Sequence, residues 1–99
     1  METSMPARRV PLEKPPTKAE ATKVERLQKA MRLRIGARLK HMRTEAGLSL
    51  RAFSMKADCS PTYLSEVEKG DRSISVEFLV RVSHFLGVHP ASFLSDEEI

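Results

Sequence analysis

The chain has 99 residues, 40% of them hydrophobic, which is room for one small domain with a compact core and a tail. One cysteine excludes a disulfide within the chain, and no apolar run approaches the roughly 18 residues that a membrane helix needs. The N-terminus also lacks the apolar core of a signal peptide, so we expect a soluble, cytoplasmic protein with no membrane partner.

The net charge of +4 is unevenly distributed along the chain. Residues 1–47 carry 12 Lys and Arg against 5 Asp and Glu, whereas residues 48–99 carry 5 against 8. A basic first half fits a polyanionic partner, because cationic side chains release counterions from phosphates. The alternative interpretation of the basic half is a solvated, solubilising segment.

Residues 1–16 contain four prolines among charged residues and are predicted to be a disordered tail. Arg8 and Arg9 would suit a DNA backbone or minor groove, and an inert tail is the alternative. At the opposite end, residues 96–99 are predicted to be a short acidic tail.

A helical extension is predicted over residues 17–31, beginning with a capping box between Thr17 and Glu20. An apolar stripe at helical spacing then runs into the following residues. Its members are Val24, Leu27, Met31, Ile35, Leu39 and Met42. Either one helix spans Lys18 to Glu45, or a separate helix ends before Arg32. The first three apolar residues either pack back on the domain or pack against a second copy.

Two short helices separated by a tight break are predicted within residues 48–70. Ser49 is the expected N-cap of the first, and Ser60 followed by Pro61 is a typical opening of the second. Gly70 ends the second helix, because glycine readily takes the left-handed conformation found there. Two helices joined by so short a turn form a helix-turn-helix, whose second helix lies in the DNA major groove.

The next helix is predicted to begin after Ser75 and to end at Gly87, followed by a short last helix over Ala91–Leu94. Phe78 and Phe85 are expected to cover the flanks of the longer helix. Its expected inner face consists of Val76, Leu79, Val82, Ser83 and Leu86.

Three pieces of the sequence carry a resemblance to a known family. They are IGARLKHMRTEAGLS, SPTYLSEVEKG and SVEFLVRVSHFLGVHPASFL. With them, residues 35–94 resemble the lambda-repressor/Cro (XRE-type) helix-turn-helix domain. The pairing of TYLSEVEKG with RSISV is also similar to restriction-modification controller proteins. The resemblance implies an all-α, five-helix lambda-repressor-like bundle over residues 32–95, preceded by the partly disordered basic extension.

The same resemblance implies a double-stranded DNA-binding transcription regulator, such as a repressor, that acts as a homodimer on a two-fold operator. It implies a partly buried ion pair between Arg43 and Glu68. Relatives have Gly in the turn where this chain has Asp58, so Asp58 is expected to take a left-handed conformation.

Predicted DNA contacts divide into those that position the protein and those that specify the base sequence. By family position, the outward set of the second helix includes Thr62, for thymine, and Glu66, for a cytosine amino group. Tyr63 is expected either to meet the DNA or to fill the gap between helices. The full predicted set of DNA-binding residues is Arg43, Ser49, Arg51, Ser60, Pro61, Thr62, Tyr63, Ser65, Glu66, Lys69 and Arg72.

Other kinds of chemistry find little support in the sequence. His41, His84 and His89 are scattered, and Cys59 is expected to be a packed thiol, so neither a metal nor a cofactor is predicted. No nucleophile, base and orienting residue can be assembled, so we do not expect an enzyme. The alternative function is an antitoxin-like protein-interaction module, favoured by Leu50 and Pro61, which lack the polar groups of many relatives.

Overall fold

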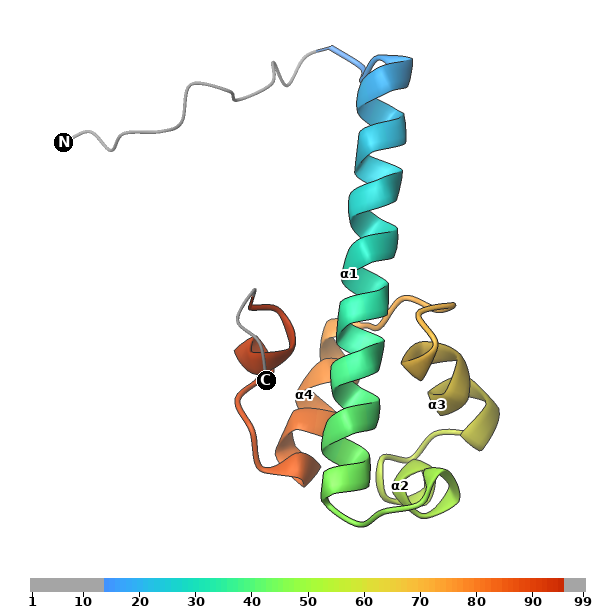
Figure 1. Ribbon diagram of the computed structural model, residues 1–99, viewed down its shortest axis with the longest axis vertical. Helices are drawn as coiled ribbons and strands as arrows, with labels where there is room; N and C mark the ends of the chain where they lie inside the picture. The colour runs from blue at the N-terminus through green and yellow to red at the C-terminus, as the bar shows by residue number, and fades with distance from the viewer. Residues whose placement is uncertain (1–13, 96–99) are drawn as a thin grey trace, which may run out of the picture.

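The computed structural model describes residues 14–95, which are helical with no β-strand in that range (Figure 1). The elements are α1 (Lys18–Glu45), α2 (Leu50–Lys56), α3 (Pro61–Glu68), α4 (Val76–Leu86) and the 3-10 helix η1 (Pro90–Phe93). The all-α class is confirmed. None of these helices is long and apolar enough to cross a membrane. Most of the predicted tail 1–16 and the whole acidic tail 96–99 lie outside the described residues.

Of the two possibilities for the first segment, the single continuous helix is the one observed. The Thr17 hydroxyl accepts from the Glu20 N–H at 3.1 Å, and the Glu20 carboxylate accepts from the Thr17 N–H at 2.8 Å. This confirms the predicted capping box. In Figure 1 the N-terminal half of α1 projects beyond the remainder of the bundle, while α3 and α4 lie on either side of its C-terminal half.

The remaining α-helices begin where the sequence predicts. Ser49, Ser60 and Ser75 each accept a hydrogen bond from the backbone N–H three residues later, at 3.0 Å in every case. These bonds satisfy N–H groups that a helix terminus otherwise leaves unpaired. The predicted left-handed conformation of Asp58 is confirmed, with φ of 58°, and it makes the sharp turn between α2 and α3 possible.

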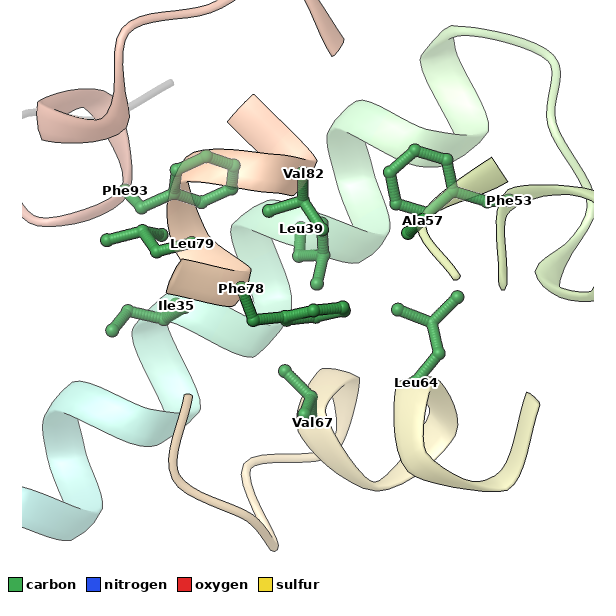
Figure 2. Packing of buried hydrophobic residues seen from close by; sticks show 10 residues of the cluster. All are labelled: Ile35, Leu39, Phe53, Ala57, Leu64, Val67, Phe78, Leu79, Val82 and Phe93. Carbon is green, nitrogen blue, oxygen red and sulfur yellow. The ribbon is translucent and has the colours of Figure 1, made fainter. Parts of the chain in front are cut away.

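One hydrophobic core joins all five elements (Figure 2). Leu39 from α1, Phe53 from α2, Leu64 from α3, Val82 from α4 and Phe93 from η1 are completely buried. The other members of the core are Ile35, Ala57, Val67, Phe78 and Leu79. The core therefore fixes α2 and α3 against α1 and α4 as one unit.

The predicted inner face of α4 is wrong at its first residue. Val76 is 72% exposed, whereas Phe78, expected on a flank, is 4% exposed and belongs to the core. The buried stripe passes through Phe78, Leu79, Val82 and Ser83, so Val76 lies with Val80 on the outward face one turn apart.

The fifth α-helix of the prediction is also wrong, because η1 is a single 3-10 turn. The N–H groups of Ser92 and Leu94 donate to carbonyls three residues earlier, at 3.0 Å each. His89 accepts from the Ala91 N–H through Nδ1 at its start, and four residues are too few for a regular α-helix. The bundle has four α-helices in the described range.

Gly36 sets the distance between α1 and α3. A Cβ atom at this position would lie 2.3 Å from the Val67 carbonyl oxygen and 2.6 Å from that of Glu68. Only glycine permits such a close approach of the two backbones. Next to this crossing, Arg32 Nε donates to the Gly70 carbonyl at 3.1 Å, which holds the end of α3 against α1.

Candidate nucleic-acid interface

The exposed N-terminal ends of α2 and α3 form the candidate interface, because the sequence predicts DNA contacts there and the structure places both ends at the surface. Ser49 and Ser60 cap the two helices, so each helix begins at the surface with its N–H groups directed outward. In α3, Ser60 occupies the Tyr63 N–H and Pro61 has none, so the Thr62 N–H remains available in the first turn. Helix N-termini of this kind favour anions through aligned N–H groups and the helix dipole.

The predicted pair between Arg43 and Glu68 is confirmed as a two-point ion pair. Arg43 Nε lies 2.6 Å from Glu68 Oε2, and Arg43 Nη2 lies 3.0 Å from Oε1. The side chains are 9% and 5% exposed, so the pair is shielded from water. Arg43 Nη1 also donates to the Leu48 carbonyl at 2.8 Å. The hydrogen bonds that Arg43 donates to the Glu68 carboxylate raise the pKa of Arg43 above its ordinary value, despite the opposing effect of burial.

This ion pair changes the role that the sequence assigned to Arg43. All three nitrogens of its guanidinium donate to protein oxygens, and the residue is 7% exposed. Arg43 thus joins α1 to the start of α2 and to the end of α3. It positions the helix-turn-helix from inside.

Tyr63, Glu66 and Arg72 form a second cluster at the edge of α3. Arg72 Nε donates to Glu66 Oε1 at 2.9 Å, and the Arg72 guanidinium lies 5.6 Å from the centre of the Tyr63 ring. The Tyr63 ring meets Phe78 edge to face, with 5.1 Å between ring centres. Tyr63 is half-buried against the core, which matches the gap-filling alternative of its prediction. The Arg72 side chain is exposed, whereas that of Glu66 is half-buried.

A shallow hollow of about 210 Å³ opens between α1, α2 and α3. Lys40 and Lys69 contribute cations to its lining, Ser65 a hydroxyl, and Leu50 an apolar wall. Lys40 was not among the predicted residues, although it lies one helical turn before Arg43 and that spacing places both on one side of α1.

Most of the other predicted residues lie at the surface of α2, of α3 and of the segments that flank them. Ser49, Arg51, Ser60, Pro61, Thr62, Lys69 and Arg72 are exposed, and Ser65 and Glu66 are half-buried on the outer side of α3. Gly36 and Arg32 hold α3 in place, but the sequence did not indicate either role. The distance between α1 and α3 and the hydrogen bond from Arg32 to Gly70 both depend on how distant segments pack, which the local sequence pattern does not show.

Comparison with known proteins identifies a family whose members are similar to this chain. A family model described as Helix-turn-helix matches residues 39–93, more than half of the chain. The control protein C.MunI of Mycoplasma sp. is 35% identical over 69 residues, which are 69% of this chain and 93% of C.MunI. The transcriptional regulator RamB of Mycobacterium tuberculosis is 31% identical over 64 residues, which are 65% of this chain but only 14% of RamB.

A solved structure shares the fold as well. The crystal structure of SinR, the master regulator for biofilm formation, in complex with DNA has a TM-score of 0.59 and 37% identity, covering 62% of this chain and 98% of that one. The matched family model, the motif geometry and these likenesses agree. The chain belongs to the XRE-type helix-turn-helix family.

Proposed function

We propose that this protein is a sequence-specific, double-stranded DNA-binding transcription regulator that acts as a homodimer, with α3 in the major groove. The observation that carries the proposal is the fixed pose of α3. Its buried side is held by Gly36 and by the Arg43–Glu68 pair, and its outer side is left to solvent. A rigidly held helix with an exposed polar face suits base recognition.

Phosphate contacts would position the protein on the duplex. The N-terminal turns of α2 and α3 offer N–H groups, and Arg51, Lys40 and Lys69 offer charge beside them. Lys40 and Lys69 line one hollow, so a phosphate there would meet two cations. The similarity of this chain to SinR, whose structure was solved in complex with DNA, supports the proposal that this fold binds DNA here as well.

Base recognition would rest on few side chains. Thr62 is exposed in the first turn of α3 and presents a hydroxyl and a methyl group, which suit an amino group or a thymine methyl. Glu66 is oriented by Arg72 and would accept from a cytosine amino group. Leu50 and Pro61 provide no donor, so deformability of the DNA would contribute the remaining specificity.

A homodimer follows from the size of the module. One short recognition helix reads few base pairs, and two copies about one helical turn of DNA apart, roughly 34–36 Å, would define a usable operator. The proposal therefore predicts an inverted repeat as the binding site.

Selection from a randomised duplex pool, at near-physiological salt with excess competitor DNA, tests the proposal. We expect an enriched inverted repeat, and Thr62→Ala should relax the preference at one symmetric pair of positions without changing the others. Retention without enrichment, lost steeply as salt rises, would contradict specific recognition and favour the protein-interaction alternative.

A further inference from the structure

The projecting half of α1 carries an apolar stripe that nothing in residues 14–95 covers. Val24, Leu27 and Met31 are 48%, 59% and 36% exposed, and their spacing of three and four residues places them on one side of the helix. The contacts of α1 with α3 are made from Arg32 onward. Packing back on the domain, one of the two sequence-based alternatives, is therefore wrong.

Such a segment needs a covering surface. A helix of about 14 residues is marginal in water by itself, and most of its stability comes from packing of its apolar side. The segment is nevertheless well formed for a helix, with a complete capping box at Thr17 and no Gly or Pro before Gly36.

We propose that this stripe packs against the same stripe of a second copy, in an antiparallel helix pair centred on Leu27. Val24 of one copy then lies near Met31 of the other, and the two Leu27 side chains meet near the two-fold axis. This inference rests on the homodimer of the proposed function. It assigns the contact between the two copies to a surface outside the helix-turn-helix.

Charge complementarity selects the antiparallel orientation. Glu20 lies about two helical turns before Leu27 and Arg34 about two turns after it, so both lie on the side of α1 that carries the stripe. A parallel pair would place each of these charges beside the equivalent residue of the second copy, and the two like charges would repel each other. An antiparallel pair places Glu20 opposite Arg34 of the second copy, beside the stripe.

The same orientation also directs both recognition helices to one side. The α1 residues that face α3, namely Arg32, Gly36 and Arg43, lie roughly a third of a turn around the helix from the stripe. The two-fold axis of an antiparallel pair is perpendicular to both helices and to the line joining them. Both α3 helices therefore lie on the same side of the pair.

The spacing along the pair fits a DNA site. At 1.5 Å per residue, the contacts of α1 with α3, from Gly36 to Arg43, lie roughly 14–24 Å from Leu27. Two copies then place their α3 helices about 27–48 Å apart along the pair, which brackets one turn of DNA at 34–36 Å.

Light scattering of the full chain without DNA, over a range of concentrations, tests whether this stripe forms the dimer. We expect the parent to have the mass of two chains and Leu27→Asp to have the mass of one. Thr22→Asp, which puts the same carboxylate on an exposed position on the opposite side of α1 from the stripe, should keep the dimer. Circular dichroism should show both variants folded. A monomeric parent, or a dimer that survives Leu27→Asp, would overturn the proposal.

Cross-linking tests the orientation in a Cys59→Ser background. Val24→Cys and Met31→Cys should form disulfide-linked dimers efficiently when mixed and poorly when each is oxidised alone. Efficient self-linking of each, without mixed dimers, would indicate a parallel pair and overturn the antiparallel one. Because both experiments omit DNA, their failure leaves the DNA-binding proposal to be judged by the pool selection.

Discussion

The Arg43 guanidinium and the Glu68 carboxylate meet at 2.6 and 3.0 Å, in a pair whose two side chains are both at least nine-tenths buried. The same guanidinium donates to the Leu48 carbonyl. One arginine thereby links the end of α1, the approach to α2 and the end of α3. The angle at which α3 is presented to a ligand depends on this contact.

Removal of the carboxylate should destabilise the fold. Glu68→Ala leaves Arg43 as a buried, uncompensated charge, and we expect a loss of about 3–5 kcal/mol in the free energy of unfolding. Urea denaturation followed by circular dichroism measures it. Glu66→Ala, which breaks an exposed pair with Arg72, is the control and should cost about 1 kcal/mol or less. Equal losses in the two variants would contradict the structural role of Arg43.

The close crossing of α1 and α3 predicts a second large effect. Gly36→Ala puts a methyl group against the Val67 and Glu68 carbonyls, which are backbone atoms that cannot move independently. We expect a loss of about 3 kcal/mol or a failure to fold. Gly47→Ala is the control, because a Cβ there meets nothing within 4 Å and strains only a positive φ, at a cost of about 1 kcal/mol. An unaffected melting temperature in Gly36→Ala would refute the crossing distance.

Local signals predicted much of this fold, whereas distances between elements could not be read from the sequence. The three serine N-caps and the left-handed Asp58 follow from side chains acting on their own backbone, and all are confirmed. The Arg43–Glu68 pair came from family resemblance. The role of Gly36 depends on how closely two helices pack, which local pattern does not encode.

The errors at the C-terminal end have the same origin. Val76 is the first residue of α4, and apolar character alone placed it in the core, although the core surrounds Phe78. At the candidate site, the sequence identified the exposed ends of α2 and α3. It did not reveal that Arg43 is fully engaged within the protein or that Lys40 lines the same hollow as Lys69.

The hollow between the helices predicts a salt-dependent contact. Lys40→Ala and Lys69→Ala should each weaken DNA binding similarly for all duplexes and reduce the slope of log affinity against log salt by about 1. Fluorescence anisotropy at several salt concentrations measures this slope. Lys18→Ala, at the far end of α1, is the matched control and should leave the slope unchanged. A loss of base preference without a change in slope would contradict a phosphate contact.

Cys59 predicts a pH effect. Desolvation by burial raises the pKa of its thiol, and nearby Arg81 offsets this only in part. Less thiolate is therefore present than in the unfolded chain, and the folded state loses stability as the pH rises from the ordinary pKa of a cysteine thiol through the raised pKa of Cys59. The rate of alkylation should rise with pH at a higher midpoint in the folded protein than in urea. Identical midpoints would contradict burial of the thiol.

The central claim is that the outer side of α3, fixed by α1, is the DNA-binding surface. An NMR titration of the amide signals with the duplex obtained from the pool selection tests it most directly. We predict the largest shift changes in the first turns of α2 and α3 and at Lys40 and Lys69, with small changes from Lys18 to Met31. Large changes confined to the projecting half of α1, with α3 unaffected, would contradict the account.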